Sequence, residues 1–420
     1  MTKTSIYHLA QTGEITESMK QVAKLENVTP EFICDKLASG EIIIMTRPGK
    51  PPLGIGTGLR TKINANIGTS SDNVHPNEEI KKAITAEKYG ADTISDLSMG
   101  GDIDNIRSEI FKVTNSPITT VPIYQSVAEC GSFKEVDIDY ILTTIKKQID
   151  QGVNSAVIHA GYTKKMLEAL RDVDRIMGMV SKGGALTAAW MIEHEVENPM
   201  LENFDEILGL LYDTDVVLSL GNTMRSGCVH DVKDNPQLNE VAMNAKLAKR
   251  ANSAGIQVIV EGMGGHVQPA EIQQFVQYYK KETGSRPLFV AGPLPIDVAV
   301  GYDHIAASVG GAMASGAGAD YLCYITPAEH LGLPNVEQVR EGVVAFKIAA
   351  HIGDTIKYGL SQRDREMAVH RHKQDWESQF KVALDGERAR EIHPPEQKIC
   401  TMCGRYCALR IMENYLKGNK

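Results

Sequence analysis

The chain has 420 residues, a hydrophobic fraction of 42% and a formal net charge of −9 at pH 7. This negative charge argues against non-specific nucleic-acid binding, and no stripe of Lys and Arg with interleaved aromatic residues occurs. No apolar run is long enough to cross a bilayer, and the start of the chain lacks the apolar core of a signal peptide. We therefore expect neither a nucleic-acid partner nor a membrane partner.

The cysteines point to a reducing compartment. There are seven of them, an odd number, and Cys34, Cys130, Cys228 and Cys323 are scattered singly along the chain. A disulfide framework would favour an even, regularly spaced set. We expect a cytoplasmic protein, most simply an enzyme.

Residues 1–60 predict a small helical cap. Glu17–Leu25 and Thr29–Ala38 have helical spacing, and Thr29 precedes Pro30 as an N-cap precedes a first-turn proline. The Pro- and Gly-rich passage Arg47–Gly58 is expected to connect this cap to the next domain.

Residues 61–358 repeat one unit, in which a short apolar run is followed by a turn and an amphipathic helix. The candidate strands are Lys62–Ile67, Thr93–Leu97, Thr119–Tyr124, Ser155–Ala160, Ile176–Val180, Val216–Leu220, Gln257–Val260, Leu288–Ala291 and Tyr321–Ile325. The expected helices include Asn77–Tyr89, Ile138–Gln151, Gln237–Ala254, Pro269–Glu282 and Val336–Lys357. Repeated βα units predict an α/β fold with a covered parallel sheet.

The number of repeats favours a closed (β/α)8 barrel as the catalytic domain. One candidate strand too many is present, so Ile176–Val180 or Lys62–Ile67 is expected to lie outside the barrel. An open doubly wound sheet is the structural alternative, although no G-x-G-x-x-G follows an early strand.

Residues 359–420 predict a helical tail that carries three closely spaced thiols, Cys400, Cys403 and Cys407. Three thiolates can hold a [4Fe–4S] cluster and leave its fourth iron open to S-adenosylmethionine, which starts radical chemistry. A structural zinc site is the alternative, because zinc prefers four thiolates or three thiolates and an imidazole such as that of His393. Spacing alone leaves both open.

Unusual polar residues recur at the carboxyl ends of the candidate strands. They are Asn66, Asp96, Tyr124, His159, Ser181, Asn222, Arg225, Glu261 and His266. Loops after different strands of a parallel barrel converge at this rim, where active sites are built. Each residue alone could be a turn former, but their recurrence at one end predicts an active site.

Two loops suggest more specific chemistry. Ser181-Lys182-Gly183-Gly184 precedes a helical segment and can form an anion nest for a phosphate, although taken alone the motif favours a plain strand-to-helix turn. His266 and His330 lie in separate loops after strands, so their imidazoles can hold a divalent metal, with zinc as the first choice. Glu261 is a candidate general base or substrate anchor.

Several motifs between Lys62 and Cys407 carry a resemblance. They are Asn64-Ala65-Asn66-Ile67-Gly68, Thr120-Val121-Pro122-Ile123-Tyr124-Gln125, Ile158-His159-Ala160-Gly161, Gly301-Tyr302-Asp303-His304 and Glu329-His330-Leu331-Gly332-Leu333-Pro334-Asn335. With them the chain resembles the phosphomethylpyrimidine synthase family of radical S-adenosylmethionine enzymes. The resemblance implies a (β/α)8 barrel, a homodimer whose cluster-bearing tail reaches the partner's active site, an external electron donor, and aminoimidazole ribotide as substrate.

The resemblance also assigns roles to residues. It implies metal ligation by His266 and His330 and cluster ligation by Cys400, Cys403 and Cys407. It implies substrate contacts from Asn66, Tyr124, His159, Ser181, Gly183, Arg225 and Glu261. Within this set we expect Tyr124, His159 and Glu261 to be catalytic, with Glu261 and His159 moving protons.

The chain departs from the family pattern around the substrate. A usual aspartate is Asn222, a usual tyrosine is Phe289 and a usual methionine is Ser95, all three expected to bind substrate. The Glu-Gly-Pro-Gly-His motif gains a residue and loses its proline, and the spacing before Cys407 is one residue short. An amide donates hydrogen bonds where a carboxylate only accepts them. Changes around the substrate, with metal and cluster residues present, suggest the same opening chemistry with another product.

The departures favour a resemblance to the sister group, 5-hydroxybenzimidazole synthase of anaerobic cobalamin biosynthesis. This enzyme rearranges aminoimidazole ribotide to a benzimidazole and releases formate and phosphate. The alternative is the family's own reaction, which yields 4-amino-5-hydroxymethyl-2-methylpyrimidine phosphate for thiamin biosynthesis. Two other classes stay open: a zinc-dependent hydrolase or lyase with a structural Cys site, and a non-catalytic nucleotide-binding sensor.

Overall fold

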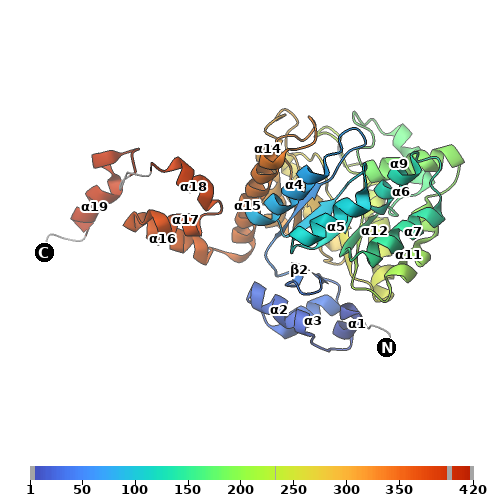
Figure 1. Cartoon of the computed structure of the whole chain (residues 1–420), viewed down its shortest axis with the longest axis horizontal. Coiled ribbons are helices and arrows are strands. Elements are labelled where there is room, and N and C mark those ends of the chain that lie inside the picture. The colour runs from blue at the N-terminus through green and yellow to red at the C-terminus, as the bar shows by residue number, and fades with distance from the viewer. Residues whose placement is uncertain (1–4, 232, 395–399, 417–420) are drawn as a thin grey trace. The chain divides into compact units, whose positions relative to one another are not determined.

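The computed structural model describes residues 5–231, 233–394 and 400–416, and it divides the chain into two compact units, Met1–Lys357 and Tyr358–Lys420. Figure 1 shows strands surrounded by helices in the first unit and helices in the second. The sequence-based division at residues 60 and 358 remains a prediction.

The first unit begins with three helices and a β-hairpin. These are α1 (Ile6–Gln11), α2 (Glu17–Glu26), α3 (Pro30–Ala38), β1 (Ile42–Met45) and β2 (Leu53–Gly56). The Thr29 hydroxyl accepts the N–H of Phe32, as expected of an N-cap. The cap is therefore not purely helical, because the antiparallel strand β2 lies inside the passage expected to be a simple connection.

Eight parallel strands form a closed barrel in the order β10-β3-β4-β5-β6-β7-β8-β9. They are β3 (Lys62–Ile67), β4 (Thr93–Asp96), β5 (Ile118–Thr120), β6 (Ser155–Ile158), β7 (Val217–Leu220), β8 (Val258–Glu261), β9 (Leu288–Ala291) and β10 (Tyr321–Cys323). Most of their residues are buried, because helices cover the outside and side chains fill the inside. The predicted (β/α)8 fold is confirmed.

Of the two candidate strands expected to include one outside the barrel, Lys62–Ile67 is β3 of the barrel and Ile176–Val180 is not a strand. Its backbone N–H groups at Ile176 and Met177 donate to the carboxylate of Asp231 instead of pairing with a strand. The Ile176 side chain is 72% exposed, so this apolar run belongs to a loop. The strand predicted over Thr119–Tyr124 is also too long, because Pro122 occupies the first turn of a helix.

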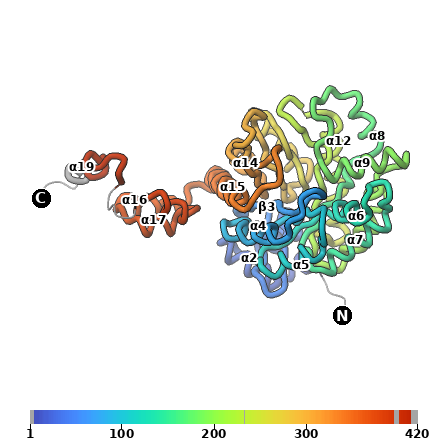
Figure 2. The backbone as a smooth tube through the Cα atoms, turned by 45° about the horizontal axis from the view of Figure 1, so that its top comes forward, coloured from blue at the N-terminus to red at the C-terminus, as the bar shows by residue number. Residues whose placement is uncertain are grey.

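Helices follow the strands and cover the barrel. They are α4 (Pro76–Tyr89), α5 (Ile103–Val113), α6 (Pro122–Cys130), α7 (Ile138–Asp150), α8 (Lys164–Ala169), η1 (Leu170–Asp172), α9 (Lys182–His194), α10 (Pro199–Glu202), α11 (Phe204–Leu211), α12 (Asn235–Ser253), α13 (Pro269–Glu282), α14 (Asp303–Ala317) and α15 (Val336–Tyr358). Figure 2 shows α4, α5, α6 and α7 in succession along the outside of the barrel.

The β1–β2 hairpin packs against one end of the barrel. Ile43, Met45 and Ile55 share an apolar cluster with Val217 and Ile259 from the starts of β7 and β8. The Gln257 side chain accepts the N–H of Ile44 at 2.6 Å and donates to the Ile44 carbonyl at 3.0 Å. The hairpin therefore packs over the amino ends of β7 and β8, beside a cavity of about 830 Å³ that Thr46–Pro52 and Asp213–Val216 help to line.

The second unit consists of short helices with few buried residues. They are α16 (Gln362–Lys373), α17 (Trp376–Val382), α18 (Gly386–Ile392), η2 (Gly404–Tyr406) and α19 (Ala408–Leu416). Local contacts hold it together, among them the Arg390–Glu377 ion pair and the packing of Trp376 on His393 at 4.3 Å between ring centroids. Among the described residues, no helix is long and apolar enough to span a membrane.

Candidate active site

A cavity of about 560 Å³ opens at the carboxyl ends of the barrel strands. Four of the predicted site residues line it: Asn66, Arg225, His266 and His330. Lys182 and Glu329 also line it, so the cavity combines cations, a carboxyl group and imidazoles from several loops. Convergence of polar groups in a concave site is typical of ligand binding.

Two of the histidines that line the cavity face each other. The Nε2 atoms of His266 and His330 lie 3.3 Å apart, and the Nδ1 atom of each faces a carboxylate. Asp297 contacts His266 Nδ1 at 2.5 Å, and Asp303 lies 3.4 Å from His330 Nδ1. Two nitrogens bound to one tetrahedral Zn²⁺ lie about 3.3 Å apart, given bonds of about 2.0–2.1 Å.

This pair fits a metal ion. Metal-binding imidazoles usually donate their second ring N–H to a carboxylate, which orients the ring and raises its basicity. Asp297 and Asp303 stand where such partners belong. Two protein ligands leave further coordination positions for water or a bound molecule, so His266 and His330 could hold a divalent ion with open positions.

The start of α9 forms a second part of the site. The Ser181 hydroxyl accepts the N–H of Gly184 at 3.2 Å and caps the helix. Lys182 lies 5.0 Å above the ring of Tyr124, and the Gly183 N–H donates to the Tyr124 hydroxyl oxygen. A lysine in the first turn of a helix favours an anion, as the sequence-based phosphate hypothesis requires.

Glycine is required where His159 packs. A Cβ at position 183 would lie 2.3 Å from His159 Cε1, and a Cβ at Gly221 would lie 2.8 Å from His159 Cδ2. Burial, together with the charge of Arg225, lowers the pKa of His159 to about 3. The imidazole is therefore neutral at pH 7 and can exchange hydrogen bonds, but it is a poor acid–base catalyst there.

Glu261 ends β8 inside the barrel mouth. Its Oε1 atom accepts a hydrogen bond from the Ser219 hydroxyl at 2.9 Å. Burial raises the pKa of Glu261 to about 7, although Ser219 and Arg225 pull it down. A carboxyl group with this pKa can both take and give a proton near neutral pH.

Hydrogen bonds to Glu240 of α12 fix the loop after β7. This buried carboxylate accepts the N–H groups of Thr223 and Met224 at 2.6 and 2.7 Å. The side-chain amide of Asn222 donates to Glu240 at 3.2 Å and to the Tyr279 hydroxyl at 3.3 Å. Asn222 Oδ1 and His159 Nδ1 are buried without a partner, and a bound ligand would satisfy such atoms.

Two predicted substrate residues lie elsewhere in the barrel. The Ser95 hydroxyl donates to Asn64 Oδ1 at 2.9 Å inside the sheet. Phe289 stacks on Tyr321 with ring centroids 4.2 Å apart and packs in the cluster that includes the β1–β2 hairpin. Neither side chain is among the residues that line the cavity, and the same is true of six other predicted site residues: Tyr124, His159, Ser181, Gly183, Asn222 and Glu261.

The three tail thiols belong to the second unit. Cys400 and Cys403 are exposed, Cys407 is half-buried, and all three are free thiols flanking the short helix η2. Free thiols on an exposed loop suit ligation of an iron–sulfur cluster. The alternative ligand His393, at the end of α18, packs at a tilt against the ring of Trp376 and edge-on against that of Phe380.

Sequence reasoning missed several residues that shape the site. The carboxylates Asp297 and Asp303 have no recognisable role until the histidine rings are placed, although Asp303 belongs to a motif noted above. Cys323 lines the cavity and accepts the side-chain N–H of Asn66 at 3.0 Å. Glu240 lies within a helix, where nothing in the spacing distinguishes it from a surface glutamate.

The fold and the cavity define a (β/α)8-barrel protein whose candidate active site occupies the carboxyl ends of the strands. The comparison with protein families then identifies the particular group. A model described as "Radical SAM ThiC family" matches residues 5–414, and the chain belongs to this family. Membership of a radical S-adenosylmethionine family implies an enzyme that uses an iron–sulfur cluster and S-adenosylmethionine.

Relatives of known name cover nearly the whole chain. A phosphomethylpyrimidine synthase of Ignicoccus hospitalis is 44% identical over 426 residues, covering 98% of this chain and 97% of the relative. One from Archaeoglobus fulgidus is 43% identical, covering 96% and 97%. One from Thermus thermophilus is 44% identical, covering 97% of each chain.

These names reorder the two functional hypotheses. The relatives are named for the pyrimidine-forming enzyme, which was the alternative drawn from the sequence. The first interpretation, 5-hydroxybenzimidazole synthase, receives less support.

Proposed function

We propose that the chain is a phosphomethylpyrimidine synthase that converts aminoimidazole ribotide into a pyrimidine phosphate by radical chemistry. The observation that carries the proposal is the match of the radical S-adenosylmethionine family model to residues 5–414, with relatives of that name at 43–44% identity. The polar cavity at the carboxyl end of the barrel supports a small, charged substrate.

The cluster ligands in this proposal are Cys400, Cys403 and Cys407, which are free thiols. These thiols would hold a [4Fe–4S] cluster, which when bound and reduced would provide the electron for cleavage of S-adenosylmethionine. The divalent ion, zinc as first choice, belongs to His266 and His330, whose facing Nε2 atoms and outer carboxylates support it. The ion would offer open positions to oxygen or nitrogen atoms of a bound molecule.

The remaining roles fall to residues around the cavity. Lys182 and the N–H groups at the start of α9 bind the substrate phosphate. Arg225, whose guanidinium donates to the Asn222 carbonyl at 2.8 Å, adds positive charge beside it. Glu261 exchanges protons with the substrate ring, and Tyr124, Asn66 and neutral His159 orient it.

Assembly as a homodimer is part of the proposal. Helices α14 and α15 expose apolar side chains, namely Ile305, Val309, Ile348, Ile352 and Ile356. Apolar side chains exposed together are typical of a protein interface. Light scattering during gel filtration would show twice the chain mass, and a monomer at micromolar concentration would contradict this part.

The decisive experiment is an anaerobic assay with aminoimidazole ribotide, S-adenosylmethionine and a reductant, with products identified by mass. A pyrimidine phosphate together with 5′-deoxyadenosine supports the proposal. Zinc without iron or sulfide in anaerobically purified protein would instead favour the hydrolase or lyase hypothesis. Substrate binding without 5′-deoxyadenosine would favour a sensor.

One observation keeps 5-hydroxybenzimidazole synthase as a second candidate. The amide at Asn222 stands where the family has an aspartate, and its Oδ1 atom is buried without a partner beside the cavity loop. A benzimidazole in the same assay would establish this second candidate. Asn222→Asp tests whether the amide sets the product, because it replaces the hydrogen-bond donor that faces Glu240 with the carboxylate that the family carries at this position.

A further inference from the structure

A tight turn after β7 presents two metal-binding side chains that the proposed function does not use. The Asp231 N–H donates to the Cys228 carbonyl at 3.1 Å and closes the turn. Cys228 is buried and His230 is exposed, and neither is part of the two-histidine pair. Gln268 donates to the Val229 carbonyl at 3.2 Å, which ties the turn to the loop before α13.

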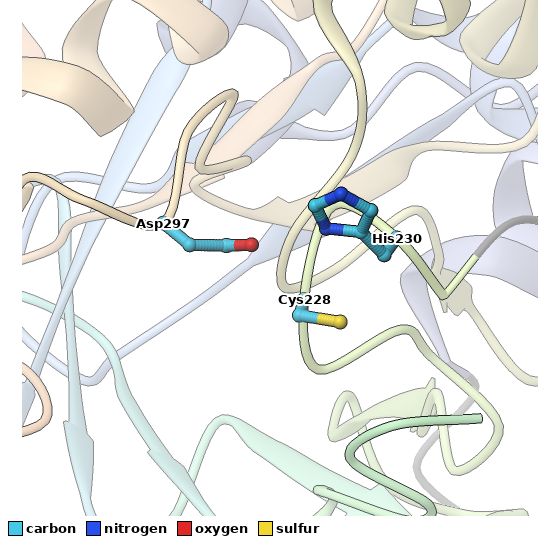
Figure 3. Close-up of side chains that lie close together, drawn as sticks. All are labelled: Cys228, His230 and Asp297. Atoms are coloured by element: carbon cyan, nitrogen blue, oxygen red, sulfur yellow. The ribbon is translucent and has the colours of Figure 1, made fainter.

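Asp297, from the loop after β9, faces this turn. Its Oδ2 atom accepts the Val229 N–H at 3.0 Å, so the carboxylate is fixed at the turn. Its Oδ1 atom contacts His266 Nδ1 at 2.5 Å. Figure 3 shows the carboxylate of Asp297 pointing toward the ring of His230, with Cys228 beside it. One ligand atom from each of the three side chains lies within 4.8 Å of the others.

We propose that Cys228, His230 and Asp297 form a second site for a divalent metal ion, adjacent to the two-histidine pair and sharing Asp297 with it. A thiolate, an imidazole and a carboxylate together suit Zn²⁺ or Co²⁺, and three protein ligands leave one position open. Donor atoms around a tetrahedral ion lie about 3.3–3.6 Å apart, so separations of up to 4.8 Å must shorten by at most about 1.2–1.5 Å. The exposed His230 ring can supply that movement by rotation.

The nearby Asp231 is not one of the three side chains whose ligand atoms lie within 4.8 Å of one another, although its carboxylate hydrogen-bonds the Cys228 thiol. Its two carboxylate oxygens already accept the N–H groups of Ile176 and Met177 at 2.7 and 3.2 Å. The carboxylate of Asp297 accepts one hydrogen bond at each oxygen, from Val229 and from His266, and each oxygen keeps a further lone pair for an ion. The turn thus supplies the neutral imidazole of His230 and the ionisable thiol of Cys228, and both lie opposite the carboxylate of Asp297.

Sharing Asp297 couples the two sites. A cation on this carboxylate withdraws electron density from its hydrogen bond to His266, which makes that imidazole a weaker ligand. Occupation of either site therefore lowers affinity at the other, and the effect is reciprocal. The two-histidine ion would then be held less firmly when the metal supply is high.

Cobalt titration tests the proposal without any activity assay. The protein is the full chain with Cys400, Cys403 and Cys407 each changed to Ser, freed of metal and titrated anaerobically with Co²⁺. We expect an absorption band from thiolate-to-cobalt charge transfer at one equivalent of bound ion. Cys228→Ser should remove the band. His230→Ala should lower the affinity for the cobalt ion that produces the band by more than about tenfold.

Matched controls separate ligation from general damage. Cys130→Ser changes another free cysteine and His8→Ala another exposed histidine, and both should leave the band unchanged. Because His230 is exposed, its replacement leaves folding intact and keeps the test valid if Cys228→Ser unfolds. Absence of the band, or a band of unchanged affinity in His230→Ala, would overturn the proposal. Failure of the proposed pyrimidine chemistry would leave this readout untouched.

Discussion

The mouth of the barrel and the C-terminal tail are built in different ways. At the barrel mouth, hydrogen bonds fix the side chains of the candidate site. Ser219 holds Glu261, and Glu240 holds the loop after β7. In the tail, Cys400 and Cys403 are exposed, and α16 and α18 contain no buried residue. We therefore infer that folding of the barrel preorganises the barrel mouth, while the order of the C-terminal tail depends on what its thiols bind.

This contrast follows from energetics. A barrel buries a large apolar interior, which outweighs the cost of fixing polar groups at its rim. A short helical segment buries little, and binding of a metal cluster by its thiolates can supply the missing stabilisation. Changes in the tail should therefore abolish cofactor binding without harming the barrel, and changes at the rim should alter catalysis or stability by graded amounts.

The largest effect is expected from Cys403→Ala. Loss of one of three thiolates should remove bound iron and sulfide and reduce 5′-deoxyadenosine formation to the detection limit. Barrel unfolding should change by less than about 0.5 kcal/mol, as is usual for a surface substitution. Iron and sulfide analysis with thermal unfolding measures both. A variant that keeps its cluster would contradict the assignment, and Cys130→Ala serves as the control.

Glu261→Gln should lower the turnover rate by about 10²–10⁴-fold, the usual contribution of a general acid or base. The wild-type rate should depend on a group with a pKa of about 7, and the variant should lose that dependence. Rate–pH profiles measure this. An unchanged profile would exclude Glu261 as the titrating group, and Glu282→Gln on the exposed end of α13 controls for charge.

The same raised pKa affects stability. Since the native state binds the Glu261 proton more tightly than the unfolded state, its contribution is complete below about pH 4.3 and is lost as pH rises through about 7. Urea unfolding should therefore show a smaller decline over this range in Glu261→Gln than in the wild type.

Asp303→Asn should weaken metal binding at the two-histidine pair by about 10–100-fold, as loss of an outer partner usually does. The carboxylate lies 3.4 Å from His330 Nδ1 and also accepts the Gly301 N–H at 3.2 Å. Competition with a zinc chelator measures the affinity. Asp139→Asn, an exposed change on α7, should have no effect. Equal affinity in both variants would mean that Asp303 does not act on the metal.

Gly183→Ala should destabilise the barrel by about 1–3 kcal/mol, because its Cβ would meet the buried His159 ring at 2.3 Å. Displacement of His159 should also raise the KM for substrate. Denaturant unfolding and steady-state kinetics measure the two effects. Gly209→Ala in α11 meets no atom within 4 Å and should be neutral or slightly stabilising. Equal stability in the two variants would show that the rim is not tightly packed.

The smallest effect is expected from Thr29→Ala at the start of α3. It removes the side-chain acceptor for the Phe32 N–H and should cost about 1 kcal/mol. Because α3 belongs to the opposite region from the cavity, the turnover rate should not change. Thr29→Ser keeps the oxygen and should retain most of the stability. A loss of activity would show that the N-terminal helices take part in the site.

The sequence predicted the barrel because its strands are short, apolar and separated by helical periods. Its errors have local causes. The run Ile176–Val180 has the composition of a strand, but Asp231 captures its N–H groups. Pro122 within the run Thr119–Tyr124 was the signal that a helix begins there. The hairpin escaped notice because β2 is only four residues long inside a Pro- and Gly-rich passage.

The sequence predicted which residues lie at the carboxyl ends of the strands, but not which of their side chains reach the cavity. Position after a strand correctly indicated that Asn66, Arg225, His266 and His330 would meet at one cavity. It could not indicate that Ser95 and Phe289 point into the packed interior, because that depends on barrel register. The carboxylates behind the histidines depend on ring orientation, which sequence spacing does not encode.

We expect the barrel alone to form the substrate site, since every residue that lines the cavity belongs to the barrel unit. Calorimetry tests this expectation most directly. Aminoimidazole ribotide is titrated into the cluster-loaded wild type and into the full chain with Cys400, Cys403 and Cys407 changed to Ser. Dissociation constants within about threefold of each other are the predicted result, since the cavity residues belong to the barrel unit. Loss of binding in the variant would contradict the claim and make the tail part of the substrate site.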